Sequence, residues 1–200
     1  MKKLILSSLL LVVVLISCNQ KNKQEQKVNT TEETEVKAEE TEAADEITEV
    51  SDAVKASVAT EAIINGYLKI KNALANDKSK EATTAATDFV NAVLATNSEK
   101  IDSKLIDKYK TITESAKKQA DLIVSNDGKI AAQRTHFAVL SKDITNLIAA
   151  FGTDKKLYQD YCPMYNEGKN GYWISEIKEI RNPYYGSEML SCGGMIKEIQ

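Results

Sequence analysis

Between residues 60 and 151 the apolar side chains recur at helical spacing in four successive runs. A period of 3.6 residues predicts amphipathic helices that bury one face. Four helices with short connections favour an antiparallel up-and-down bundle, and both prolines lie beyond the runs. The runs cover residues 63–74, 82–94, 105–123 and 130–151, and they are separated or ended by Asn76-Asp77, Thr96-Asn97-Ser98, Asn126-Asp127-Gly128 and Gly152.

The composition changes after residue 152. Six of the eight tyrosines and the single tryptophan, Trp173, fall between Tyr158 and Tyr185. Residues 172–174 are suited to a short strand, and 182–186 to a turn. We expect an all-α protein: a four-helix bundle with a small irregular aromatic C-terminal lobe folded onto one end of it. Packing of the lobe is the simplest role for these aromatic residues, since each buries a large area.

The N-terminus has the form of a secretory signal. Lys2 and Lys3 precede an apolar stretch from residue 4 to residue 16, which is too short to be a spanning helix. The sequence Leu15-Ile16-Ser17-Cys18 resembles a bacterial lipobox. That resemblance implies cleavage after Ser17 and lipid attachment to Cys18. The alternative is an ordinary signal peptide cut nearby, which would leave Cys18 as a free thiol.

Residues 19–50 contain ten acidic and four basic residues, a net charge of −6, and no aromatic residue. Such a segment cannot bury enough apolar surface to order itself, so we expect a disordered tether. The predicted organisation is a signal at 1–18, the tether at 19–50, the bundle at 51–152 and the lobe at 153–200, the last two forming one domain. That domain carries a net charge of about +1 without a basic stripe, which argues against nucleic-acid binding.

Two thiols in the lobe each lie beside a thioether, in Cys162-Pro163-Met164 and in Met189-Leu190-Ser191-Cys192. Soft sulfur ligands of this kind favour Cu(I), whereas Zn(II) takes four nitrogen or sulfur ligands. The candidate metal ligands are Cys162, Met164, Met189 and Cys192, with Met195 as a further thioether. The single histidine, His136, would add a nitrogen ligand if its helix end met the lobe; otherwise it is an ordinary surface or core residue.

The same two cysteines could instead close a structural Cys162–Cys192 disulfide, which suits an oxidising compartment. The two states could also alternate, with only the reduced thiols binding metal. Enzyme motifs are missing from the sequence: it has no nucleophile elbow, no phosphate-binding glycine loop and no zinc-protease helix. We therefore expect a non-enzymatic protein.

Several short motifs together resemble the domain-of-unknown-function family 3347. They are Tyr67-Leu68-Lys69, Arg134 to Ser141, Tyr158 to Met164, Trp173, Asn182 to Gly186 and Met189 to Gly193. The resemblance covers residues 60–199, and its C-terminal part is the more specific. That family looks like a set of periplasmic or surface lipoproteins, and it also occurs fused to adaptor subunits of heavy-metal efflux pumps.

The resemblance implies a metal-handling role, with copper as the expected ion and a metal-efflux adaptor or another copper-handling protein as the partner. Together with the lipobox, it predicts a protein held to the membrane by its lipid. The absence of an early acidic run after Cys18 favours the periplasmic face of an outer membrane. A metal-free helical interaction module, stapled by the disulfide, is the alternative function.

Overall fold

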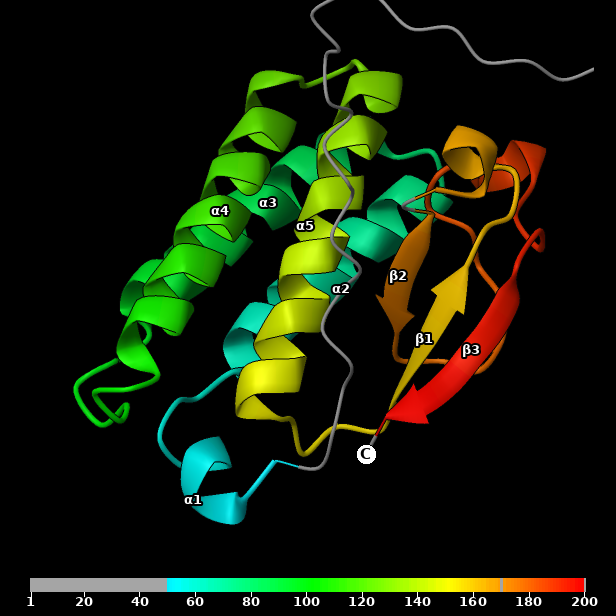
Figure 1. The fold of residues 1–200 in the computed structure, drawn as a ribbon. Helices are drawn as coiled ribbons and strands as arrows, with labels where there is room; N and C mark the ends of the chain where they lie inside the picture. Colours follow the sequence, from blue (N-terminus) through cyan, green and yellow to red (C-terminus); the bar gives the residue numbers. More distant parts are fainter. Residues whose placement is uncertain (1–49, 170, 200) are drawn as a thin grey trace, which may run out of the picture. The chain divides into compact units, whose positions relative to one another are not determined.

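The computed structural model describes residues 50–169 and 171–199. The predicted signal, the predicted lipidation site Cys18 and all but the last residue of the predicted tether lie outside these residues. The described part of the chain is mostly helical and ends in a small three-stranded antiparallel sheet (Figure 1). No helix in it is both long and apolar enough to cross a membrane.

The four predicted helices are present as α2 (Glu61–Ala75), α3 (Ser79–Ala95), α4 (Ile106–Ser125) and α5 (Ile130–Phe151). They end at or next to the predicted breaks, and Gly152 follows α5 with the positive φ of 71° that glycine tolerates best. A short extra helix, α1 (Asp52–Lys55), has no buried residue and gave no periodic signal. The third run was predicted from residue 105, and α4 begins at Ile106, so residues 96–105 connect α3 with α4.

Helices α2 to α5 each pack against the next one along the chain, and α5 also contacts α2. The faces that meet are the predicted apolar ones, with Ile64, Phe89 and Ile144 fully buried. Small side chains line the contact between α2 and α3. A Cβ at Gly66 would lie 3.0 Å from the Phe89 Cα, so glycine is needed there for the two helices to approach this closely.

The prediction of an all-α fold with an irregular lobe is confirmed only in part: the described residues are mostly helical, but the lobe contains a sheet. Strand β1 (Leu157–Tyr161) is central and pairs antiparallel with β2 (Tyr172–Ser175) and with β3 (Gly194–Ile199). The predicted strand at 172–174 corresponds to β2. Strands of four to six residues paired across long loops produce little periodicity, which is why β1 and β3 were missed.

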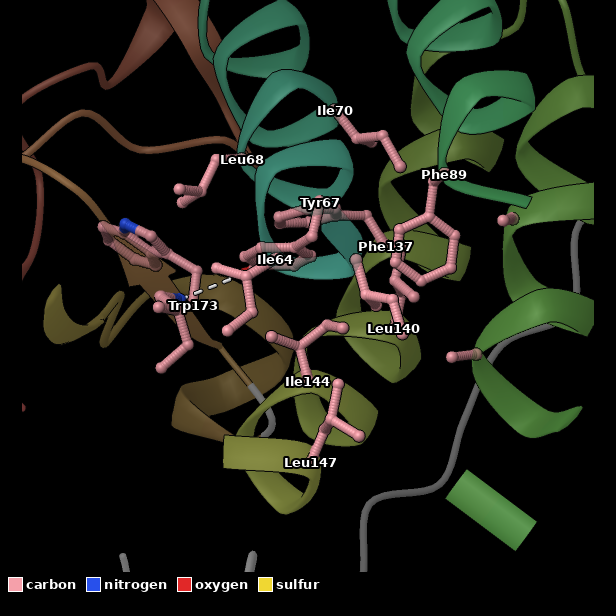
Figure 2. Packing of buried hydrophobic residues seen from close by; sticks show 14 of the residues in the cluster. Ile64, Tyr67, Leu68, Ile70, Phe89, Phe137, Leu140, Ile144, Leu147 and Trp173 are labelled. Carbon is pink, nitrogen blue, oxygen red and sulfur yellow. Dashed lines mark hydrogen bonds between the residues drawn. The ribbon is translucent and has the colours of Figure 1, made fainter. Parts of the chain in front are cut away.

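The sheet lies along the side of the helices rather than on one end of them. Strand β2 packs on α5 and α2, and Figure 1 shows the sheet on the opposite side of these two helices from α4. Aromatic rings join the two parts: Tyr67 stacks on Phe137 at a centroid distance of 5.2 Å, and Phe137 meets Tyr184 of the lobe at 5.8 Å. Figure 2 shows Tyr67 and Phe137 within this core, with Trp173 on the lobe side. Helices and lobe therefore share one hydrophobic core.

Candidate functional site: the Cys162–Cys192 thiol pair

The structure brings together the two cysteines of the lobe, although thirty positions separate them in the sequence. Cys162 directly follows β1, and its N–H donates to the Gly171 carbonyl at 2.8 Å. Cys192 ends the loop that precedes β3, and its N–H donates to the Met189 carbonyl at 3.0 Å. The pairing of Tyr161 with Gly194 brings the two residues near each other, and the Cys162 side chain is close enough to raise the pKa of Cys192. Both cysteines are free thiols. We call them the thiol pair.

The two thiols differ in access to solvent. Cys162 is buried, with 1% of its surface exposed, whereas Cys192 is partly exposed. Partial burial and the neighbouring Cys162 thiol both raise the pKa of Cys192, which therefore stays protonated at neutral pH. The thiol pair is thus a buried sulfur anchored in the lobe beside a second sulfur that can be reached from outside.

Asn182 organises the loop that carries Cys192. Its backbone N–H donates to the Leu190 carbonyl at 2.7 Å, and its side-chain amide donates to the Cys192 carbonyl at 2.8 Å. Its side-chain oxygen accepts the Tyr184 N–H at 2.8 Å, and the residue is fully buried. Asn182 therefore connects the two ends of the loop and holds the backbone of Cys192 in position.

The three methionines near the thiols lie at the surface. Met164, Met189 and Met195 are 57%, 39% and 42% exposed, so none of them is held in the core. Met164 and Met189 remain close in sequence to their cysteines, and the Met189 carbonyl is bonded to the Cys192 N–H. The structure thus brings the two thiols near each other and leaves the three thioethers at the surface.

His136 does not join the thiol pair. Its Nδ1 lies 3.1 Å from Gln119 Oε1, so the ring faces α4. The next residue, Phe137, points towards the lobe, and one helical step rotates a side chain by about 100°. Within residues 50–169 and 171–199, no three His, Cys, Asp or Glu side chains are grouped so that they could hold a metal ion.

Sequence reasoning missed a buried charged cluster beside this site. The Lys71 ammonium, fully buried on α2, contacts Glu176 Oε2 at 2.7 Å and Ser175 Oγ at 3.3 Å. Burial lowers the pKa of Lys71 against the opposing effect of Glu176. Burial alone would raise the pKa of Glu176, but hydrogen bonds from Lys71 and Asn72 outweigh this effect, so the pKa of Glu176 is lowered. The available sequence signal was a lysine, Lys71, at an apolar position of the helical repeat.

Asp160, two residues before Cys162, is fully buried and belongs to the same cluster. Neither carboxylate oxygen has a hydrogen-bond partner among the described residues. Burial raises its pKa to about 7, while Lys71 and Trp173 act in the opposite direction. Trp173 is the cross-strand partner of Asp160, so both side chains lie on one face of the sheet.

The comparisons with known proteins relate the helical part of the chain to a protein family. A family described as "Protein of unknown function (DUF3347)" matches residues 63–156. No curated protein and no solved structure shows significant similarity to the chain. The matched region covers the helices, which we judged the less specific part of the resemblance, and it ends before Cys162. Over residues 63–156 the chain belongs to the DUF3347 family of proteins of unknown function.

Proposed function

We propose that this protein is a lipid-anchored envelope protein that binds a soft metal ion, Cu(I), through the thiol pair for capture, transfer or efflux. The proximity of Cys162 and Cys192, which the pairing of β1 with β3 brings about, is the observation that carries the proposal. In this proposal Cys18 holds the lipid, residues 19–50 are the tether, and α2 to α5 form an antiparallel up-and-down bundle as scaffold. A metal-efflux adaptor or another copper-handling protein is the proposed partner.

The number and type of available ligands favour Cu(I) over Zn(II). Zinc sites in proteins use four nitrogen or sulfur ligands when structural and three when catalytic. The described residues offer two thiols with thioethers nearby, and no group of three His, Cys, Asp or Glu side chains. Soft thiolate and thioether donors select Cu(I). The residues present therefore fit a soft ion with few ligands.

Each side chain has a role that follows from its position. Cys162, buried at the end of β1, would be the fixed ligand. Cys192, partly exposed, would be the ligand that an incoming ion meets first, and Met164 and Met189 would supply exposed thioethers next to the thiols. Both thiols must lose a proton to bind metal, so loading releases protons.

The alternative is a metal-free interaction module with a Cys162–Cys192 disulfide. The same proximity of the thiols supports it, because an oxidising envelope would allow the bond to form. Closing a loop of this length would add roughly 3–4 kcal/mol of stability in the loop-entropy description. In the alternative, the exposed residues of the lobe would serve a protein partner and not a metal ion.

A titration distinguishes the two functions. The full chain carrying Cys18→Ser, in mild detergent, has Cys162 and Cys192 as its only thiols. Titrated against a chromogenic Cu(I) chelator under argon with a non-thiol reductant, it should bind about one Cu(I) per chain. Cys162→Ser and Cys192→Ser should each lose this binding, while His136→Ala should keep it. Thiols that resist alkylation as isolated, and that bind no Cu(I) after reduction, would establish the alternative.

A further inference from the structure

A polar contact far from the thiols in sequence fixes the loop that carries Cys192. The Arg134 guanidinium on α5 donates from Nε to the Pro183 carbonyl at 2.9 Å and from Nη2 to the Leu74 carbonyl at 3.0 Å. Its Nη2 also contacts Asp77 Oδ1 at 2.6 Å. One side chain, 12% exposed, therefore connects α5, the end of α2 and the loop.

Asp77 completes this contact from the other side. Its Oδ2 accepts the Ser187 N–H at 2.9 Å. Hydrogen bonds from Ser187 lower the pKa of Asp77, burial opposes them slightly, and Arg134 adds to the lowering. Asp77 has a φ of 59°, which is unfavourable for a residue with a side chain and persists only where surrounding contacts hold it. A Cβ at Gly186 would overlap the Asp77 carboxylate and the Arg134 guanidinium, so the loop backbone lies directly on this ion pair.

The loop connects the Arg134–Asp77 ion pair to Cys192. Pro183 and Ser187 belong to the same loop as Asn182, whose backbone and side chain bind Leu190 and Cys192. Cys162 is held by a separate element, since it follows β1 and bonds to Gly171. The approach of Cys192 to Cys162 therefore depends on how the loop docks on the helices.

We propose that Arg134, together with Asp77, is a positioning residue for the thiol pair: it docks the loop of residues 181–192 on α2 and α5 and so sets the approach of Cys192 to Cys162. Arginine suits the role because its planar fork serves three acceptors at once, which an ammonium on a flexible stem does not reproduce. The part of the inference that concerns metal affinity rests on the proposed function, whereas the positioning itself can be measured without metal.

The test measures the effective concentration of one thiol at the other. The full chain with Cys18→Ser is equilibrated in mixtures of reduced and oxidised glutathione, and the closed fraction is quantified after acid quenching and alkylation. Closure oxidises Cys162 and Cys192 to a disulfide and reduces one oxidised glutathione to two reduced molecules. A loosened loop samples more positions, so the effective concentration falls.

We expect Arg134→Gln to lower the effective concentration about tenfold, as removal of a charge-assisted contact would. Arg134→Lys should recover part of the loss, and Asp77→Asn should cause a smaller one. Gln133→Ala is the matched control. Gln133 is the buried neighbour of Arg134 on α5 but bonds to Ser79, Thr83 and Ile123, on the side of the helices away from the loop. It should lower stability while leaving the effective concentration unchanged.

Three results would overturn the inference: an Arg134→Gln value within twofold of the parent, an equal loss in Gln133→Ala, or thiols that fail to close in the parent chain. If Arg134→Gln does not fold, Arg134→Lys and Asp77→Asn decide the matter by the same criterion. Cu(I) competition on the same variants should show a parallel fall of about tenfold. If the effective concentration falls in Arg134→Gln but the parent chain binds no Cu(I), the proposed function is refuted and the positioning role of Arg134 still holds.

Discussion

The hydroxyl of Tyr67 should be one of the main polar links between the helices and the sheet. It accepts the backbone N–H of Ile174 in β2 at 3.0 Å and bonds to Ser141 Oγ on α5 at 2.9 Å. Tyr67 is fully buried, and its ring stacks on Phe137. Tyr67→Phe removes the hydroxyl alone and leaves this ring packing in place, so the variant isolates the two hydrogen bonds.

The cost follows from what the substitution leaves behind. The Ile174 N–H loses its side-chain partner, and a buried donor without a partner costs about 1–3 kcal/mol. The Ser141 hydroxyl can rotate towards another acceptor, so its share is smaller. We expect Tyr67→Phe to lower the free energy of unfolding by about 2–3 kcal/mol.

Tyr109→Phe is the matched control. Tyr109 is also buried, and it packs edge-on against Phe151, but its hydroxyl has no hydrogen-bond partner among the described residues. Losing an unpaired buried hydroxyl should be neutral or slightly stabilising, by less than about 0.5 kcal/mol. The two substitutions delete the same atom from the same residue type, so their difference reports the hydrogen bonds.

Equilibrium unfolding in urea measures both variants. Trp173 is the single tryptophan and is fully buried in the lobe, so its fluorescence follows the sheet, while circular dichroism follows the helices. Hydrogen exchange at the Ile174 amide should accelerate in Tyr67→Phe. In a double-mutant cycle, Ser141→Ala should couple to Tyr67→Phe by about 1 kcal/mol. Equal stabilities of the two Tyr→Phe variants, within about 0.5 kcal/mol, would refute the assignment of the Tyr67 hydroxyl as a link.

Three further predictions concern charge and backbone. Burial raises the pKa of Asp143 to about 6, while Ser115 and Lys142 act in the opposite direction. The folded state therefore favours the protonated carboxyl, and this stabilising contribution is present below pH 3.8 and is lost as pH rises through 6. Asp143→Asn should stabilise the chain by about 1–3 kcal/mol at pH 8 and change little at pH 3.5, as measured by urea unfolding at both pH values. Glu176→Gln should cost about 2 kcal/mol because the buried Lys71 ammonium loses its charged partner, and the double variant with Lys71→Met should be more stable than Glu176→Gln alone in thermal unfolding. Gly186→Ala should lower the free energy of unfolding by about 2 kcal/mol or more, because alanine would have to adopt a backbone φ of 57° and its Cβ would overlap Asp77. A loss below about 0.5 kcal/mol in urea unfolding would contradict the close docking of the loop.

The helices could be predicted from the sequence because their signal is local. Each of the four runs repeats apolar residues every three or four positions, and Asn, Gly or Thr marks most ends. The sheet could not be predicted in the same way. Its pairings connect Leu157 with Ile199 and Tyr158 with Ser175, and no residue within a strand indicates which distant segment it will meet.

The candidate site was likewise predictable from the sequence only in part. The grouping of soft sulfur ligands in the sequence predicted Cys162 and Cys192 as site residues, and the structure places them near each other. It also leaves the methionines exposed and turns His136 towards α4, because sequence proximity does not decide which way a side chain points. Lys71 and Asp160 were missed since charged residues are rarely buried, and their burial depends on contacts from another element.

The helices do more than support a separate lobe, because their lobe-facing side chains determine its conformation. Tyr67 binds β2, Phe137 packs on Tyr184, and Arg134 holds Pro183, so two helices contact the sheet and the thiol-bearing loop at three independent points. Cys162 and Cys192 sit on elements fixed by different contacts. A change in the helices can therefore alter the distance between the thiols without touching either one. In the proposed function, which depends on the approach of two sulfur atoms, the helical platform is part of the site.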